Sequence, residues 1–134
     1  MHLDAATPDR RLTDAVSRYV DFSGRSAAPE EMLEAPGHAV TVLIDLDRGW
    51  TVEGERHRSF VGGLYARPVR VRHEGSFRGV QFDVEPPAVR AIFGVPAREL
   101  LQTTVGLDQL LGPDAERWVQ RYRRAGALLD GAQA

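Results

Sequence analysis

The strongest structural signal in the chain is the stretch AVTVLIDL, residues 39–46. In an extended strand its alternate side chains would point to opposite faces. Its even-numbered residues are all aliphatic: Val40, Val42, Ile44 and Leu46. Thr41 and Asp45 point the other way, with Leu43 as the exception. This period of two predicts a β-strand that is buried on at least one face. The sequence DRG that follows it, at residues 47–49, predicts a turn.

Further strands are predicted on the C-terminal side of this one. They are Trp50–Val52, Ser59–Leu64, Pro68–His73 and a last strand in which Val80, Phe82 and Val84 line one face while Gln81 and Asp83 line the other. The consecutive glycines Gly62 and Gly63 predict a bulge, a sharp bend or the close approach of another backbone. About five or six short strands with tight turns are typical of an antiparallel β-sandwich or barrel. No long helical pattern separates the strands, so parallel βαβ units are not expected.

The N-terminal part of the chain is less decisive. Residues 1–11 are polar and predicted to be loosely held. Residues 14–21 carry Val16, Tyr19 and Val20 at a spacing that suits one helical face, but the same residues with Phe22 could equally open a strand, and both interpretations stay open. Residues 23–36 are rich in Ser, Ala, Glu and Pro and are predicted to be a connection.

The pattern becomes helical after residues 85–87, Glu-Pro-Pro. Short helices are predicted at Ala88–Phe93, Ala97–Leu101 and Leu107–Leu111, the first of them ended by Gly94. The last helix is the most amphipathic, and its apolar stripe consists of Ala115, Trp118, Val119, Tyr122, Ala125 and Leu129. We therefore predict an α+β protein in which residues 1–134 form a single domain, with a β-barrel at about 15–85 and a helical subdomain at about 86–130.

Composition excludes several classes of function. The chain has 134 residues, a net charge of −2 and no cysteine, so disulfides and thiolate chemistry are excluded. It has neither an apolar run long enough to cross a bilayer nor an N-terminal signal-peptide pattern, so we expect a cytoplasmic protein without a membrane partner. Lysine and asparagine are absent while arginine is common, which indicates a GC-rich genome and weakens any argument from arginine clusters.

Catalytic and metal-binding patterns are weak. The four histidines, His2, His38, His57 and His73, are scattered and lack the spacing of metal ligands. The serines lack the Gly-x-Ser-x-Gly elbow, and the carboxylate pairs fall in turn-like segments. We therefore predict no catalytic residues, no metal and no cofactor, and do not expect an enzyme.

Two surfaces could carry a binding function. Residues 48–78 have an excess of arginine over glutamate, so Arg70 and Arg72 could form an anion-binding face, although an exposed strand face is the favoured interpretation. Residues 107–124 superficially resemble a helix-turn-helix. The first helix is too short, however, and the second places Trp118 and Tyr122 on its apolar stripe, so packing or dimerisation is favoured.

Three segments near the C-terminus resemble the N-terminal, effector-binding domain of a branch of bacterial AraC-type transcriptional regulators. They are RGVQFDVEP at 78–86, AIFGVPAREL at 91–100 and VGLDQLLG at 105–112. Earlier pieces match in order: Tyr19-Val20, Pro36-Gly37 through Val42-Leu43-Ile44, and Ser59 through Leu64. The resemblance spans roughly residues 12–125 and is most specific in Phe93 through Leu100 followed by Leu107 through Gly112.

The resemblance implies a cupin-like β-barrel or jelly roll followed by C-terminal helices. In such regulators the barrel senses a small molecule, the helices often dimerise, and a separate C-terminal domain with two helix-turn-helix units binds DNA. The present sequence ends before that domain, so we expect DNA to be bound only through a domain absent from this chain. No motif of this branch fixes the effector.

The predicted function is therefore a ligand-sensing and dimerisation domain of an AraC-type regulator that forms a homodimer. Candidate ligand-binding residues are Trp50, Phe60, Arg70 and Phe82, and candidate dimerisation residues are Trp118 and Tyr122. Aromatic residues on a sheet that curls around a cavity would line an apolar pocket. The alternatives are a stand-alone cupin-like enzyme of the isomerase or cyclase type and a purely structural dimerisation module with a filled interior.

Overall fold

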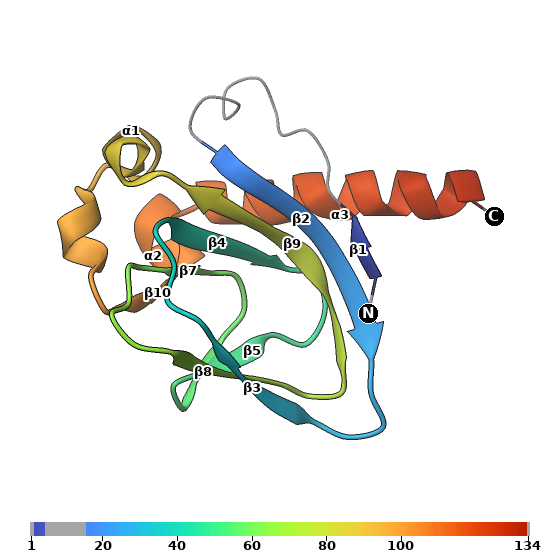
Figure 1. The fold of residues 1–134 in the computed structure, drawn as a ribbon. Helices are drawn as coiled ribbons and strands as arrows, with labels where there is room; N and C mark the ends of the chain where they lie inside the picture. Colours follow the sequence, from blue (N-terminus) through green and yellow to red (C-terminus); the bar gives the residue numbers. More distant parts are fainter. Residues whose placement is uncertain (1, 5–15, 134) are drawn as a thin grey trace.

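The computed structural model of the chain describes residues 2–4 and 16–133, and the side chains of residues 16–125. It is an α+β structure with two antiparallel sheets facing each other and helices on the outer side of the larger sheet (Figure 1). This confirms the predicted class and the order of strands first and helices afterwards. The described strands form two separate sheets and not one closed barrel.

The larger sheet has six strands in the order β1-β2-β9-β4-β7-β10. Their bounds are His2–Asp4 for β1, Val16–Arg25 for β2, Ser76–Val84 for β9, Val40–Asp45 for β4, Phe60–Gly62 for β7 and Thr104–Gly106 for β10. The predicted strand at residues 39–46 is β4, and it lies near the centre between β9 and β7. Residues 14–21, left open by the sequence, contain the first part of β2.

The smaller sheet has four strands in the order β3-β8-β5-β6. Their bounds are Glu30–Glu34 for β3, Val69–His73 for β8, Trp50–Val52 for β5 and Glu55–His57 for β6. The strand β3 is a correction, because residues 23–36 were predicted to be a connection. All five of its residues are exposed, and it pairs only with β8 among the described strands, so it is an edge strand.

The helical part follows the prediction closely. Its elements are the 3₁₀-helix η1 (Pro86–Ala88), α1 (Val89–Phe93), the 3₁₀-helix η2 (Ala97–Leu100), α2 (Leu107–Leu111) and α3 (Asp114–Gln133). Gly94 ends α1 in the left-handed conformation, with φ of 77°, as the sequence indicated. The side chain of Gln109 accepts a hydrogen bond of 2.9 Å from the backbone N–H of Gly106 and so holds the start of α2. Within the described residues, no helix is long and apolar enough to cross a membrane.

The strands of the larger sheet separate two hydrophobic cores. Alternate residues of β4 and β9 face the helices, where they pack with side chains of α1, α2 and α3 in a completely buried cluster. The intervening residues face the smaller sheet, and two of them, Leu43 and Phe77, form a second cluster with Trp50, Val52 and Val71. These two clusters explain the period of two in the sequence, and they show that both faces of the larger sheet are covered.

Of the two consecutive glycines, Gly63 confirms the predicted close approach of another backbone, whereas a Cβ atom on Gly62 would have space. A Cβ atom on Gly63 would overlap the carbonyl oxygen of Leu100 in η2. The backbone N–H of Gly63 also donates to the carbonyl of Thr103, over 2.8 Å. Glycine at position 63 therefore allows β7 to lie directly against the segment that joins η2 to β10.

The chain termini extend beyond the described residues. The loosely held segment predicted at residues 1–11 falls outside them except for His2–Asp4, which form β1 and pair with β2. The apolar stripe of the last helix is described as far as Ala125, so the predicted place of Leu129 in that stripe lies outside the described side chains.

Candidate ligand pocket

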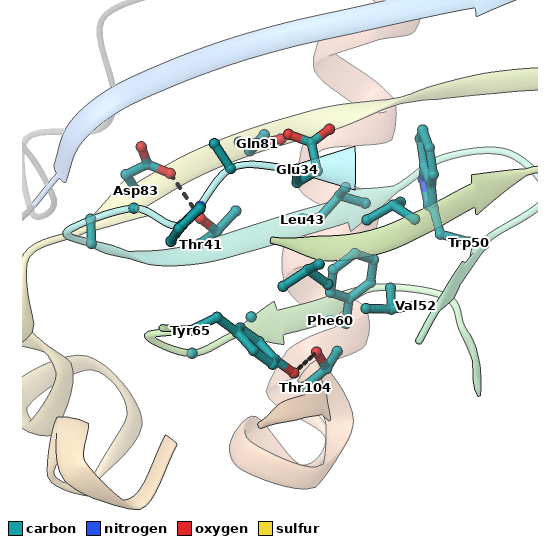
Figure 2. Close-up of a pocket in the computed structure, with 18 of the residues that line it drawn as sticks. Glu34, Thr41, Leu43, Trp50, Val52, Phe60, Tyr65, Gln81, Asp83 and Thr104 are labelled. Atoms are coloured by element: carbon teal, nitrogen blue, oxygen red, sulfur yellow. Dashed lines mark hydrogen bonds between the residues drawn. The ribbon is translucent and has the colours of Figure 1, made fainter. Parts of the chain in front are cut away.

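A cavity of about 390 Å³ lies between the two sheets. Its walls come from both sheets and from the segment that joins β3 to β4, residues 35–39. Known small-molecule sites in proteins have volumes of roughly 300–1,000 Å³ and are mostly apolar with a few polar groups. The cavity is within this range, and its lining is described below from one end to the other (Figure 2).

One end of the cavity is aromatic and aliphatic. Trp50 and Val52 from β5 face Phe60 from β7 and Leu43 from β4 (Figure 2). The ring of Trp50 also meets Phe22 edge-on, with ring centroids 6.0 Å apart. These side chains are each at least nine-tenths buried. This end of the cavity therefore presents an apolar surface against which the apolar part of a ligand could be buried.

The other end of the cavity is polar. Thr41 donates a hydrogen bond of 3.2 Å to the carboxylate of Asp83, and Gln81 lies next to them on β9 (Figure 2). On the opposite wall the hydroxyls of Tyr65 and Thr104 form a hydrogen bond of 2.7 Å. The cavity thus combines an apolar end with a polar end that presents hydroxyl, amide and carboxylate groups.

Three charged side chains line the cavity: Arg18, Glu34 and Asp83. Arg18 and Asp83 are cross-strand partners in the register of β2 and β9, and Glu34 is the last residue of β3. Within the described part of the chain, none of the three belongs to an ion pair. Arg18 and Glu34 are exposed, whereas Asp83 is half-buried.

Two of the four predicted ligand-binding residues line this cavity, and two do not. Trp50 and Phe60 lie at its apolar end. Phe82 lies on the opposite face of β9, where it packs against Trp118 with ring centroids 6.0 Å apart. The sequence could not show which face of the last strand meets the helices, because the alternation of Val80, Phe82 and Val84 is the same in either orientation.

Arg70 also lies away from the cavity. It is on β8 between Val69 and Val71, whose side chains line the cavity, so Arg70 points to the outer face of the smaller sheet. Its side chain is 63% exposed and lies 3.3 Å from the carboxylate of Glu31.

The arginine-rich outer face is therefore an ion-paired surface. Besides the pair of Arg70 and Glu31, Arg72 lies 3.7 Å from Glu74 and Arg67 lies 2.9 Å from Glu53. The pKa of Glu53 is lowered by a hydrogen bond from the backbone N–H of Arg70 and by the side chain of Arg67. This arrangement favours the interpretation of an exposed, charge-balanced strand face over that of an anion-binding site.

Trp118 and Tyr122, the predicted dimerisation residues, pack on the larger sheet of their own chain. The ring of Tyr122 lies 6.4 Å from that of Phe82 and 6.1 Å from that of Tyr19, measured between centroids. Both side chains remain partly exposed. Their role in the fold is therefore to anchor α3, and their role in dimerisation stays a prediction.

The histidines whose side chains the structure describes are His38, His57 and His73, and they do not form a metal site. Among the described residues there is no group of three or more His, Asp or Glu side chains that could hold a metal ion. His73 is completely buried, its Nδ1 accepts a hydrogen bond from the backbone N–H of Gly75, and its ring packs 4.6 Å from Phe77. His57 packs on Phe60 at 5.7 Å. These contacts indicate structural roles for both residues.

The polar end of the pocket was missed by the sequence analysis. Thr41, Gln81 and Asp83 alternate with apolar residues on two strands, a pattern that usually means a face in water. They are instead directed into the space between the sheets. The sequence carried no signal for this, because the alternation of polar and apolar residues is the same whether the polar face meets water or a second layer.

Comparison with known proteins adds no assignment: no family model matches the chain, and neither a curated protein nor a solved structure does so.

Proposed function

We propose that this chain is the ligand-sensing domain of an AraC-type transcriptional regulator, and that the two sheets are a cupin-like sandwich that holds a small effector between them. The observation that carries the proposal is the cavity of about 390 Å³ with one apolar and one polar end. The resemblance of residues 78–112 to the effector-binding domains of these regulators supports the same function. The proposed regulator acts as a homodimer and binds DNA through another domain.

The contents of the cavity favour binding over catalysis. Its described lining contains no histidine. The hydroxyls of Tyr65 and Thr104 bond to each other, and that of Thr41 bonds to Asp83. An activated nucleophile needs a neighbouring base that is itself oriented by a third group, and no such arrangement is present among these residues. Aromatic walls with a few hydrogen-bonding groups are typical of a site that recognises a molecule without changing it.

The strand β10 connects the cavity to the helices. Thr104 lines the cavity, and three residues later the chain enters α2 at Leu107, which is buried in the helical core. The helix α2 in turn contacts α3. A ligand that prefers one position of β10 would shift the population of that position and carry α2 and α3 with it. In this mechanism α3 reports the occupied state to the dimer partner or to the DNA-binding domain.

The proposal can be tested by filling the cavity. Gly62 lies on β7 between Val61, which faces the helices, and Gly63, and a Cβ atom at this position meets only the carbonyl oxygen of Thr41, at 3.9 Å. The series Gly62→Ala, Gly62→Val and Gly62→Leu therefore adds increasing volume to the cavity with little backbone strain. Thr51→Leu is the matched control, because Thr51 lies between the cavity-lining Trp50 and Val52 and so faces outward.

We expect a broad thermal-shift screen to yield compounds that stabilise the wild-type chain, since a ligand at one hundred times its Kd adds about 2.7 kcal/mol to the free energy of unfolding. The shift should decrease along the Gly62 series and persist in Thr51→Leu. Compounds that stabilise Gly62→Leu as well as the wild type, or a screen without any stabilising compound, would contradict the proposal. Native mass spectrometry of the same samples measures the oligomeric state with and without the compound.

A further inference from the structure

The charges that line the cavity indicate the class of ligand. Asp83 and Glu34 are two carboxylates, and Arg18 is the one cation that lines the described cavity. The carboxylate of Asp83 accepts a hydrogen bond from the neutral hydroxyl of Thr41, and it forms no ion pair with any side chain that the structure describes. With two carboxylates and one guanidinium, the formal charge of the described lining as a whole is negative.

A bound ligand should feel the charge of the Asp83 carboxylate more strongly than that of the Arg18 guanidinium, because the two groups differ in burial. Asp83 is half-buried beside Thr41, while Arg18 is exposed on the neighbouring strand. Water and salt screen an exposed charge more strongly than a partly buried one. Figure 2 shows Asp83 and Trp50 at opposite ends of the cavity, with Glu34 between them beside Gln81 and Leu43. A bound molecule thus meets negative charge at one end and aromatic surface at the other.

We propose that the ligand is an organic cation, an amine or quaternary ammonium group carried on an aromatic or alicyclic body. The body lies against Trp50 and Phe60, the cationic group lies near Asp83, and Glu34 adds a second negative charge midway along the cavity. The ring of Tyr65, also at the polar end, adds an aromatic face of the kind that attracts such cations. The inference rests on the proposed function, because it names the ligand class of the same cavity.

The test uses three probes of the same shape and different charge: phenylpropylamine, phenylpropanol and phenylpropionate. The chain has two tryptophans, and Trp50 alone lines the cavity. In a Trp118→Phe background the fluorescence of Trp50 therefore reports occupancy directly, and calorimetry on the wild-type chain gives the affinities. We expect the amine to bind most tightly, the alcohol less tightly and the carboxylate least.

Isosteric variants identify the source of the preference. Asp83→Asn keeps the acceptor for Thr41 and removes the charge, so it should weaken the amine by about tenfold while changing the alcohol by less than about twofold. Glu34→Gln should have a smaller effect of the same sign, because Glu34 is exposed. Arg18→Gln is the matched control of opposite sign and should strengthen binding of the amine or leave it unchanged.

The outcomes separate the two proposals. Equal affinity for the amine and the alcohol, tightest binding of the carboxylate, or an unchanged amine affinity in Asp83→Asn would each overturn the cation inference and leave the cavity as a binding site. No binding by any of the three probes would also overturn it, while the screen against the Gly62 series decides the proposed function by itself.

Discussion

The two faces of the larger sheet are built from the same strands and have opposite properties. On β4, the residues Val40, Val42 and Ile44 face the helices and are completely buried, whereas Thr41 and Leu43 face the other sheet and line the cavity. Helices fill the first face because their side chains enter the grooves of the sheet. The second face meets a sheet that touches it closely only at the aromatic end. Alternate residues of the same strand therefore stabilise the fold on one face and line the cavity on the other.

The ionisation of Tyr19 is affected by its position on β2, at the edge of the helix-covered face. Burial raises the pKa of Tyr19 far above its ordinary value, and the neighbouring Tyr122 and Asp21 add to this effect. A phenolate is strongly disfavoured in such surroundings because it loses its hydration. Because Tyr19 is only partly buried, the raised pKa reflects partial loss of hydration at this one phenol, where it packs beside Tyr122 of α3.

The largest expected difference between the two faces comes from truncating one phenylalanine on each. Phe82 is 1% exposed on the helix-covered face, and Phe60 is 6% exposed at the wall of the cavity. Phe82→Ala leaves a closed void and should lower the free energy of unfolding by about 4 kcal/mol, whereas the space left by Phe60→Ala joins the existing cavity and should cost about 2 kcal/mol. Urea denaturation of both variants measures this difference. Equal costs would mean that the cavity is not open space in solution.

Adding one methyl group at Gly62, the last residue of β7, or at the adjacent Gly63 compares the two faces of the larger sheet directly. Gly63→Ala should destabilise the fold by about 3 kcal/mol, because the new Cβ overlaps the backbone of Leu100 on the helix-covered side. Gly62→Ala directs the same methyl group into the cavity and should change stability by less than about 1 kcal/mol. The check is again the urea midpoint, and a reversed order would show that the alternation of β7 has been assigned to the wrong faces.

A smaller effect is expected from Asp45, which is buried on the cavity-facing side of β4. Burial raises the pKa of its carboxyl group, although hydrogen bonds from the backbone N–H groups of Gly49 and Asp47 oppose this. A folded-state pKa above the unfolded value means that the stabilising contribution is present at low pH and is lost as the pH rises through the folded pKa. Asp45→Asn should therefore gain stability relative to the wild type as the pH rises from about 4 to 7.

Chemical denaturation at several pH values measures this relative gain. Because other carboxyl groups titrate in the same range, the informative quantity is the difference between the variant and the wild type at each pH. A difference that stays constant, or that shrinks as the pH rises, would show that the Asp45 carboxylate is well solvated in the folded protein.

The smallest effect is predicted for Arg70, on the outer face of the smaller sheet. Exposed ion pairs contribute roughly 0–1 kcal/mol, so Arg70→Gln should change the free energy of unfolding by less than about 0.5 kcal/mol. Its binding of any compound found by the screen should equal that of the wild type, since the side chain points away from the cavity. Weakened binding in this variant would restore Arg70 as a ligand-binding residue.

Sequence reasoning predicted most elements of the fold because their signals are local. The alternation in β4 and β9 and the proline and glycine signals around α1 and α2 depend only on neighbours in the chain. The strand β3 was missed since Glu-Glu-Met-Leu-Glu has no period of two, and its strand conformation comes from pairing with β8. The N-terminal strand β2 stayed ambiguous because its apolar residues fit either period.

The pocket was only partly predictable for a different reason. Trp50 and Phe60 were selected as large aromatic residues on strands, which is a property of the sequence. The exclusion of Phe82 and the inclusion of Asp83 depend on which layer covers which face, and that is decided by the helices on one side and by the smaller sheet on the other. Pairing between distant segments thus determines the site, although each strand is recognisable alone.

The free edge of β3 has a consequence for self-association. An unpaired strand edge offers backbone groups to any second strand, and here it carries the exposed apolar side chains Met32 and Leu33. Glu30, Glu31 and Glu34 surround them, so two such edges that approach each other at neutral pH meet with like charges. Acid that protonates these carboxylates removes the repulsion while leaving the backbone groups available, so two molecules should then pair through their β3 edges more readily than at neutral pH.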